Sequence, residues 1–295
     1  MKFGAIDIGT NAARLLIGEV EEQEKDHYVK KISYTRIPLR LGIEVFEKGK
    51  ISDEKAKEFV KSIKAFKLIS EVFKVQELRA CATSAMREAE NGKDIKKLIK
   101  KETGVNIEII EGSEEAKLIL STFFLLDFDR KNPFVVIDVG GGSTEISIFK
   151  KGEKVAAKSF PIGTIRILKG KVKSSSWKDM YAWIDDKFKK SNKYLVFATG
   201  GNINKIHKIL GKKSLESIEI KEFMELHERL SGLSLKKRVS EYKLKPDRAD
   251  VIVPAFEIYA SIFKQIKLDE VYVPKIGLSD GMIYNLHKKH KHKKE

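Results

Sequence analysis

Cysteine is almost absent from this chain of 295 residues, and so are long uninterrupted apolar runs. The single cysteine, Cys81, has no second cysteine with which to form a disulfide within the chain. Its apolar surroundings in ELRACATSAM, without a neighbouring histidine, favour a small core residue over a nucleophile. No apolar stretch at the N-terminus has the length of a secretory signal peptide or of a membrane-spanning helix. We therefore expect a soluble, cytoplasmic protein.

Histidine is also scarce outside the C-terminal tail. Three of the six histidines lie in the last nine residues, HKKHKHKKE, and the others are His27, His207 and His227. None of these three is spaced as a metal ligand, so histidine-based zinc chemistry is not expected. The tail itself has two interpretations, adventitious metal binding or disorder.

Acidic residues are in the minority: 42 Asp and Glu face 58 Lys and Arg, for a net charge of +16. The last nine residues carry five lysines and one glutamate, which leaves +12 on the rest of the chain. A basic body favours polyanionic partners, which are nucleic acid, anionic membrane or phosphate-rich small molecules. The lysines are also spread along amphipathic segments such as KAKEFVKSIKAF, where a solvated helix face explains each run by itself.

Three consecutive glycines interrupt an apolar segment in VVIDVGGGSTEISIF, residues 135–149. The turn and its flanks supply Asp138, Gly140, Gly141, Gly142, Ser143, Thr144 and Glu145. Without Cβ atoms, the glycine N–H groups can converge on an anion, and the backbone can adopt positive φ without strain. A tight hairpin is the plainer interpretation of such a turn. The flanking carboxylates and hydroxyl groups favour a phosphate cradle beside a bound divalent cation.

A second copy of this pattern occurs near the N-terminus, in FGAIDIGTNAARLLI, residues 3–17. An offset of 131 residues aligns Phe3, Ile6, Asp7, Gly9 and Ile17 with Phe134, Ile137, Asp138, Gly140 and Ile148. Two such strand-turn-strand units predict a duplicated α/β protein whose two turns face one cleft. The same offset aligns Arg14 with Glu145, so one half brings a cation where the other brings an anion.

The rest of the chain repeats one order of elements, three strands followed by alternating helix and strand. The segment DFDRKNP interrupts the pattern, which predicts an N-terminal domain over 1–126 and a C-terminal domain over 127–278. The predicted C-terminal helix, about 279–295, would pack back on the first domain. Among the other predicted helices are 52–73, with Ser52 as its N-cap, and single helices within 221–242 and 247–264.

Seven segments in order carry a resemblance to a known family: IDIGTNAARLLI, ATSAMREAEN, IIEGSEEAKL, VIDVGGGSTEI, ATGGNINK, RADVIVPA and GLSDGMIYN. The chain resembles the exopolyphosphatase and guanosine pentaphosphate phosphatase (Ppx/GppA) family, in its short, two-domain form. This resemblance implies a duplicated actin-like (ribonuclease H-like) ATPase fold, α/β in class, with an interdomain cleft. A homodimer is one assembly that it allows.

The resemblance also implies the catalytic base. It places this base at the glutamate before Ala116 and a basic residue, which is Glu115. Relatives often carry arginine where this chain has Lys117, which keeps the charge but loses bidentate phosphate contact. The neighbouring Glu114 is explained by a favourable interaction with the helix dipole.

The remaining expected site residues bind phosphate or a divalent cation, Mg²⁺. The expected metal ligands are Asp138, Glu145 and Asp7. The expected phosphate-binding residues are Gly9, Thr10, Asn11, Arg14, Arg87, Gly140, Gly141, Gly142, Ser143, Thr144, Gly200 and Gly201. Hydrolysis of a phosphoanhydride needs an oriented water and positive charge on the transferred phosphoryl group. Glu115 would orient the water, and the cation, the arginines and the turn amides would supply the charge.

The leading functional hypothesis is a Mg²⁺-dependent exopolyphosphatase that releases terminal orthophosphate from inorganic polyphosphate. A guanosine pentaphosphate (pppGpp) 5′-phosphohydrolase is the near alternative. The superfamily fold also leaves open an ATP-dependent kinase or ATPase, and the same residues could serve a sensor that binds polyphosphate or an alarmone without turnover. Neither a membrane nor a specific nucleic acid is expected as a partner.

Overall fold

The computed structural model describes residues 1–22, 27–123, 126, 128–129, 131–188, 194–213 and 216–291. The chain divides into two compact units: unit 1 is Met1–Phe128 with Ile276–Glu295, and unit 2 is Asp129–Lys275. The last four residues of the basic tail lie outside the described residues, and so does part of the DFDRKNP segment.

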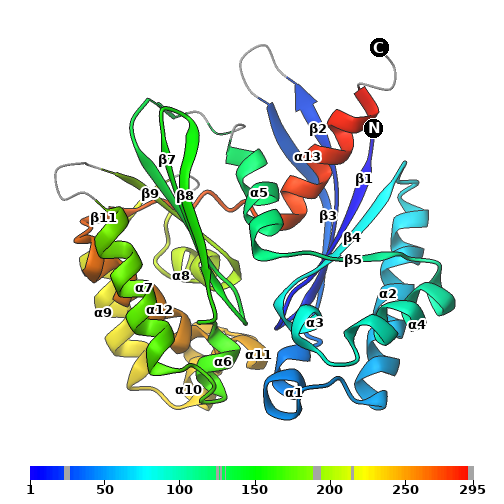
Figure 1. Ribbon diagram of the computed structural model, residues 1–295, viewed down its shortest axis with the longest axis horizontal. Helices are drawn as coiled ribbons and strands as arrows, with labels where there is room; N and C mark the ends of the chain where they lie inside the picture. Colours follow the sequence, from blue (N-terminus) through cyan, green and yellow to red (C-terminus); the bar gives the residue numbers. More distant parts are fainter. Residues whose placement is uncertain are drawn as a thin grey trace. The chain divides into compact units, whose positions relative to one another are not determined.

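Unit 1 is built on a five-stranded mixed sheet in the order β3-β2-β1-β4-β5 (Figure 1). Its strands are β1 (Phe3–Ile8), β2 (Ala13–Glu22), β3 (His27–Ile37), β4 (Leu78–Ala82) and β5 (Ile107–Ile109). Its helices are α1 (Leu41–Lys48), α2 (Asp53–Val72), α3 (Ser84–Glu88), α4 (Gly92–Thr103), α5 (Gly112–Phe123) and α13 (Leu278–Lys291). The first three strands are antiparallel, whereas β4 and β5 run parallel to β1.

Helices cover both faces of this sheet. The last helix, α13, packs on β1, β2 and α5, whereas α2 and α4 lie against the opposite face (Figure 1). All six residues of β1 are buried, as expected for a strand covered on both faces. The hydroxyl of Ser52 caps α2 by accepting a hydrogen bond from the Lys55 N–H, which confirms the predicted N-cap.

Unit 2 repeats this plan with a four-stranded mixed sheet in the order β8-β7-β6-β9. Its strands are β6 (Phe134–Val139), β7 (Thr144–Lys150), β8 (Glu153–Phe160), β9 (Leu195–Thr199), and a separate pair, β10 (Ile218–Glu219) with β11 (Glu270–Val271). Its helices are α6 (Thr164–Leu168), α7 (Ser174–Lys187), α8 (Gly201–Ile209), α9 (Ile220–Ser231), α10 (Leu235–Tyr242), α11 (Pro246–Ala249) and α12 (Ile252–Ile266). The apolar helix α12 is largely buried and packs on α6, α7, α8, α9 and β6.

The duplication predicted from the offset of 131 residues is therefore present in the fold. In each unit the first two strands form a hairpin, the third strand pairs with the second, and the next strand runs parallel to the first. A parallel bridge between Phe197 and Tyr272 occupies, beside β9, the place that β5 holds beside β4. These features confirm the predicted α/β class and the duplicated actin-like fold.

Two helices predicted as continuous are each broken in two. The segment 221–242 forms α9 and α10, because the chain leaves the first helix at Gly232 and Ser234 caps the second. The segment 247–264 forms α11 and α12. Pro254 has no N–H to donate to the carbonyl of Asp250. A continuous helix would therefore lack one backbone hydrogen bond at this point, whereas a helix that begins just before the proline loses none.

Cys81 is fully buried in β4, and burial raises the pKa of its thiol to about 12. The residue is thus part of the core, as its sequence context predicted, because a protonated, inaccessible thiol is a poor nucleophile. In the described parts of the chain, no helix combines the length and the hydropathy that crossing a membrane requires.

The close packing of α13 against α5 depends on Gly281. A Cβ atom at this position would lie 2.0 Å from the carbonyl oxygen of Leu118. We expect Gly281→Ala to lower the free energy of unfolding by roughly 1–3 kcal/mol, because overpacking against backbone outweighs a helix-propensity gain of about 1 kcal/mol. Urea unfolding followed by circular dichroism measures this loss. Gly277→Ala is the control, because nothing lies within 4 Å of a Cβ there, and equal stability of the two variants would contradict the prediction.

Candidate functional site

The turn between β1 and β2 in unit 1 is fixed by backbone hydrogen bonds. The Gly9 N–H donates to the Ala12 carbonyl over 3.1 Å, which closes the turn. The start of α1 docks on it, because the Arg40 N–H donates to Asn11 O (3.1 Å) and the Gly42 N–H donates to Thr10 O (3.0 Å). These bonds use the carbonyl oxygens of the turn. The predicted phosphate-binding residues of this segment therefore lie in one rigid loop.

Charged side chains form a row across the three antiparallel strands beside this turn. Asp7 on β1 pairs with Arg14 on β2, and Arg14 pairs in turn with Arg36 on β3. Residues directly opposite each other project from the same face of a sheet. Arg14 Nη1 donates to Asp7 Oδ2 over 2.6 Å, and both side chains are largely buried. The structure thus brings the expected phosphate ligand Arg14 into contact with the expected metal ligand Asp7.

The third part of the unit 1 site is the junction between β5 and α5. Arg87 on α3 donates to the Ile110 carbonyl over 2.7 Å, and its Nε lies 3.6 Å from a carboxylate oxygen of Glu111. The Glu111 carbonyl accepts the Glu115 N–H over 3.0 Å, which starts α5. Arg87 is therefore held beside the helical turn that carries Glu115, and Glu114 and Glu115 are both half-buried.

In unit 2, the triple-glycine turn presents its amide groups in one direction. The carbonyls of Gly140 and Gly141 accept N–H groups from the first residues of α6, and Gly142 O accepts Nε of Arg166. In a trans peptide the N–H points opposite to the C=O. The N–H groups of the three following residues, Gly141, Gly142 and Ser143, therefore point away from α6, which is the arrangement of an anion-binding nest.

Positive φ does not explain the glycines of this turn, since none of the three has one. The freedom to adopt positive φ, anticipated from the sequence, is not used here. Instead, α6 lies directly against the turn at Gly163, where a Cβ would be 2.4 Å from Gly141 O. Thr144 is fully buried and its hydroxyl donates to Ile162 O over 2.6 Å, so this hydroxyl fastens β7 to the loop before α6.

Beside the turn, a row of polar side chains crosses the sheet of unit 2. Asp138 on β6 is directly opposite Glu145 on β7. The Ser159 hydroxyl donates to Glu145 (2.7 Å) and the Thr199 hydroxyl donates to Asp138 (2.8 Å). Opposed carboxylates repel one another unless a cation lies between them. Oxygen donors of this kind are what Mg²⁺ and Ca²⁺ bind, so Asp138 and Glu145 fit a divalent cation.

The assignment of Asp7 as a third metal ligand stays a prediction. Within the described ranges, no three His, Cys, Asp or Glu side chains are grouped so that they could hold a metal ion. A cation bound by Asp138 and Glu145 would then complete its coordination with water or substrate oxygens, as Mg²⁺ commonly does.

The turn after β9 packs against the carboxylate of Asp138. Gly200 has a φ of +116° and a Cβ there would lie 2.9 Å from Val139 O and 3.3 Å from Asp138 Oδ1, so only glycine fits. The next residue, Gly201, begins α8, and its carbonyl accepts a hydrogen bond from Arg248. The predicted Gly200 therefore lies beside Asp138, and Gly201 follows it at the start of α8.

Sequence reasoning missed four arginines, namely Arg36, Arg40, Arg166 and Arg248. Two of them hold carbonyl groups of the glycine turns in unit 2, and the other two belong to the turn region of unit 1. The strand pairing that places Arg36 opposite Arg14 could have been found by aligning the third strand with the second. The contacts of the other three depend on tertiary packing.

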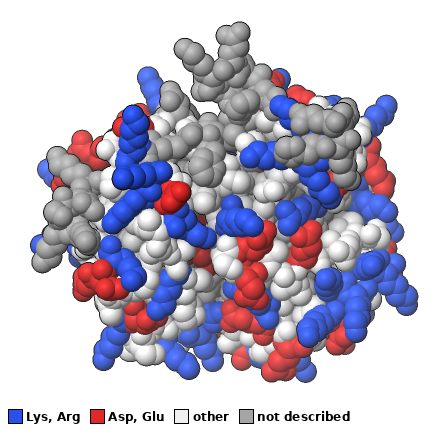
Figure 2. Space-filling model, turned by 45° about the horizontal axis from the view of Figure 1, so that its top comes forward, with Lys and Arg blue, Asp and Glu red and all other residues white. Residues whose placement is uncertain are grey.

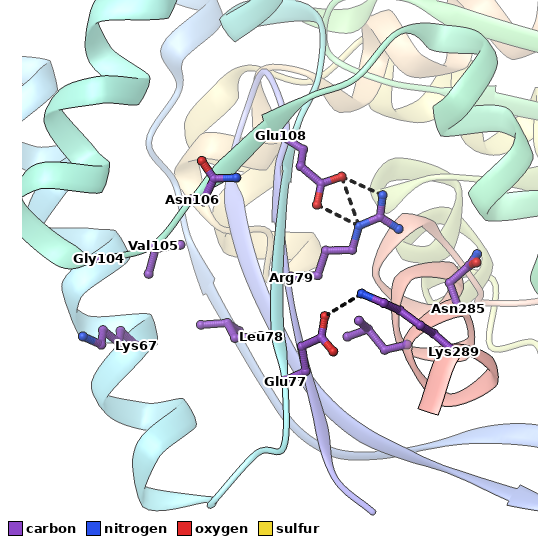
Figure 3. Close-up of a pocket in the computed structure, with 11 residues that line it drawn as sticks. Lys67, Glu77, Leu78, Arg79, Gly104, Val105, Asn106, Glu108, Asn285 and Lys289 are labelled. Atoms are coloured by element: carbon purple, nitrogen blue, oxygen red, sulfur yellow. Dashed lines mark hydrogen bonds and ion pairs between the residues drawn. The ribbon is translucent and has the colours of Figure 1, made fainter. Parts of the chain in front are cut away.

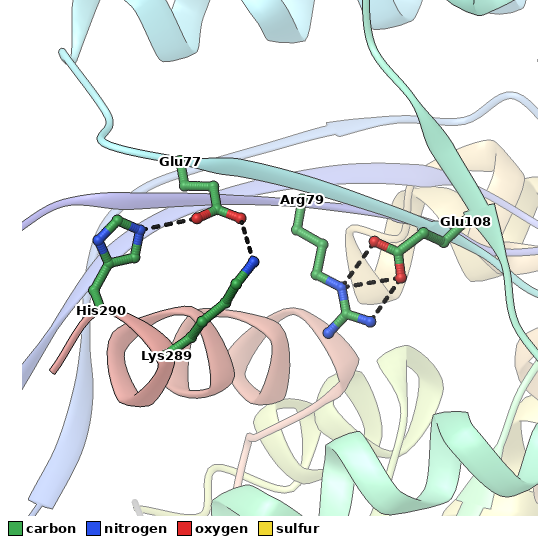
Figure 4. A network of polar contacts seen from close by, with 5 residues as sticks. All are labelled: Glu77, Arg79, Glu108, Lys289 and His290. Atoms are coloured by element: carbon green, nitrogen blue, oxygen red, sulfur yellow. Dashed lines mark hydrogen bonds and ion pairs between the residues drawn. The ribbon is translucent and has the colours of Figure 1, made fainter. Parts of the chain in front are cut away.

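A cavity of about 780 Å³ lies elsewhere in unit 1, between the start of β4, the loop before β5, α2 and α13 (Figure 3). Ion pairs line its wall: Arg79 binds Glu108 through two nitrogens, and Lys289 lies 3.5 Å from Glu77 (Figure 4). His290 Nε2 is 2.8 Å from the same Glu77. The charges are largely matched, so this network fastens the end of α13 to β4.

The fold and the arrangement of its turns define a duplicated α/β protein of the actin-like class. More narrowly, the chain belongs to the Ppx/GppA phosphatase family, whose model matches residues 20–290.

The chain is similar to several proteins of known name. It is 28% identical, over 304 aligned residues, to a bifunctional 3-dehydroquinate synthase/phosphatase of Fusobacterium nucleatum, covering 91% of this chain and 44% of that protein. It is 32% identical, over 167 residues, to exopolyphosphatase 1 of Mycobacterium tuberculosis, covering 57% of this chain and 48% of that protein. The chain thus spans about half the length of these curated relatives.

Solved structures share the fold along nearly the whole chain. An exopolyphosphatase from Cytophaga hutchinsonii matches with a TM-score of 0.83 at 22% identity, covering 98% of both chains. The Ppx/GppA family member of Aquifex aeolicus matches with a TM-score of 0.76 at 22% identity, again over 98% of both chains.

The contact between Gly163 and the triple-glycine turn generates a prediction. We expect Gly163→Ala to weaken tripolyphosphate binding about tenfold or more, because the added Cβ displaces carbonyls that orient the amide nest, and hydrogen bonds to charged groups are strong. Titration calorimetry measures the affinity. Gly232→Ala in the same unit is the control, because its nearest atoms would be 3.8 Å away. Unchanged affinity in Gly163→Ala would mean that the nest does not bind phosphate.

Proposed function

We propose that this chain is a divalent-cation-dependent phosphohydrolase that releases terminal orthophosphate from inorganic polyphosphate. The observation that carries the proposal is the structure around β6 and β7, in which an amide nest lies beside the opposed carboxylates Asp138 and Glu145. A nest that binds phosphate oxygens and a cation that neutralises them are the two requirements of phosphoryl transfer. Family membership and the exopolyphosphatase name of the Mycobacterium relative support the choice of substrate.

In this proposal the residues have separate roles. Glu115 accepts a proton from the attacking water or orients it, and its position in the first turn of α5 holds its backbone rigidly. Arg87 and Arg14 bind phosphate oxygens, together with the amides of Thr10 and Asn11. The Gly9 N–H closes the turn by donating to Ala12 O, so Gly9 contributes by shaping the loop. In unit 2, the amides of Gly141, Gly142 and Ser143, and the glycines of the turn at 200 and 201, bind phosphate oxygens.

Asp138 and Glu145 would hold the cation, for which we propose Mg²⁺. A bound Mg²⁺ supplies positive charge to the phosphate oxygens. The hydroxyls of Ser159 and Thr199 each donate a hydrogen bond to one of the two carboxylates and so help to orient them.

Guanosine pentaphosphate is the alternative substrate within the same chemistry. The excess of 58 basic over 42 acidic residues favours the longer polyanion. Figure 2 shows lysine and arginine side chains spread over the viewed face, with fewer acidic side chains among them. We further propose a cytoplasmic location and a homodimeric assembly.

Orthophosphate release from purified protein tests the proposal. Long-chain polyphosphate, pppGpp and ATP are supplied separately with Mg²⁺, and faster release from polyphosphate than from pppGpp or ATP is expected. Preferred release from pppGpp would replace the proposed substrate by the alternative. Turnover of ATP alone would favour a kinase or ATPase, and binding of polyphosphate without any release would indicate a sensor.

The role of Glu115 makes a specific prediction. Glu115→Gln should retain the fold and polyphosphate binding but lose about 10²- to 10⁴-fold in kcat, since an amide cannot accept the proton of the water. Glu114→Gln is the matched control, and its kcat should stay near wild type. Equal losses in the two variants would remove Glu115 from the role of base.

The carboxylate pair makes another prediction. Asp138→Asn and Glu145→Gln should each raise the Mg²⁺ concentration needed for half-maximal activity, because each removes one charge from the metal site while keeping its shape. The change is measured by Mg²⁺ titration at saturating polyphosphate. Glu153→Gln on β8, an exposed acid, is the control, and a Mg²⁺ requirement unchanged in both site variants would exclude the pair as metal ligands.

A further inference from the structure

We infer that Arg36 contacts the second phosphoryl group of the substrate, and so lets unit 1 distinguish a phosphoanhydride chain from free orthophosphate. The inference rests on the proposed function for the identity of the ligand. The geometry that carries it is the row Asp7, Arg14, Arg36 across β1, β2 and β3.

The two units have different residues at the position on the third strand that lies opposite Arg14 in unit 1 and opposite Glu145 in unit 2. In unit 2, Ser159 on the third strand donates a hydrogen bond to Glu145 on the second. In unit 1, the third-strand residue Arg36 lies opposite Arg14. Arginine has donors and no acceptor, so these two side chains cannot bond to one another. A ligand with acceptor oxygens can join them, as phosphate does.

Charge leads to the same conclusion. Like charges directly opposite each other on neighbouring strands are destabilising. Asp7, on the first strand of the row, is bonded to Arg14 over 2.6 Å, so the row as a whole carries more positive than negative charge. An anion placed over Arg14 and Arg36 lowers their mutual repulsion, and guanidinium groups bind phosphate oxygens in pairs. Two guanidinium groups side by side match two adjacent phosphoryl groups better than a single one.

The row also lies at the correct end of the strands. Asp7 is two residues before Gly9 of the turn, Arg14 is the second residue of β2 and Arg36 is the last but one of β3. An anion held by the turn amides is therefore close to Arg14, and the next phosphoryl group along a chain can reach Arg36.

The experiment compares Arg36→Gln with Arg229→Gln, a charge-matched control at an exposed position of α9. Titration calorimetry with tripolyphosphate and with orthophosphate, in EDTA to prevent turnover, gives the two affinities. Arg36→Gln should weaken tripolyphosphate binding about tenfold or more and orthophosphate binding less than about twofold. Arg229→Gln should leave both affinities unchanged.

Two results would overturn the inference. In the first, Arg36→Gln has the same affinity for tripolyphosphate as the control variant. In the second, Arg36→Gln loses affinity for tripolyphosphate and for orthophosphate by the same factor. Circular dichroism checks folding of each variant. If Arg36→Gln does not fold, Arg36→Lys decides, because it keeps the charge and loses the paired contact. Arg36→Lys should weaken the binding of tripolyphosphate but not that of orthophosphate. Wild-type affinity for both ligands would refute the contact between Arg36 and the second phosphoryl group.

Kinetics separate this inference from the proposed function. With Mg²⁺ and polyphosphate, Arg36→Gln should raise KM and leave kcat nearly unchanged, as expected for a contact made equally in the ground and transition states. If the wild-type protein releases no orthophosphate, the proposed function fails, yet the ratio of the two affinities in EDTA still decides whether Arg36 binds the second phosphoryl group.

Discussion

The register of two hairpins positions the charged residues of the proposed site. In each unit the last polar residue of the first strand lies directly opposite a charged residue of the second, Asp7 with Arg14 and Asp138 with Glu145. A slip of one residue in either pairing would turn one member of each pair to the other face of the sheet. The glycine turns keep the strands in register, because Gly9 and Gly140 each close their turn by donating to a carbonyl three residues later.

The same register gives the two units opposite electrostatics. Unit 1 combines a carboxylate with guanidinium groups, whereas unit 2 places two carboxylates together and surrounds them with hydroxyl groups from Ser159 and Thr199. Equivalent positions of the duplicated fold thus carry the proposed phosphate ligand in unit 1 and a proposed cation ligand in unit 2. The buried Tyr259 belongs to the same arrangement: its hydroxyl donates to Thr199 O, and burial, with the nearby charge of Asp138, raises its pKa well above the ordinary value. This tyrosine therefore stays neutral and acts as a donor.

Much of the fold followed from local patterns in the sequence. The offset of 131 residues anticipated both hairpins, and Ser52 marked the start of α2 because capping is a short-range effect. The breaks before α10 and α12 were missed because amphipathic periodicity continues through Gly232 and Val251. The close approach at Gly163 could not be predicted either, since it depends on where α6 folds back against the turn. The hydrogen bonds from Arg166 and Arg248 to carbonyl groups of the glycine turns could not be predicted either, because they depend on tertiary packing.

The position of α13 has a consequence for unit 1 as a whole. This helix, supplied by the chain only after unit 2, contacts β1, β2 and α5. Gly281 lets it approach the backbone of Leu118 on α5. Lys31 on β3 binds the carboxylate of the buried Asp280. Burial raises the pKa of Asp280 above its ordinary value, although the charge of Lys31 acts in the opposite direction. Because α5 also carries Glu115, the helix that bears the proposed base is supported by a segment more than 150 residues away in sequence. The packing of unit 1 around α5 is therefore complete only with the C-terminal segment in place.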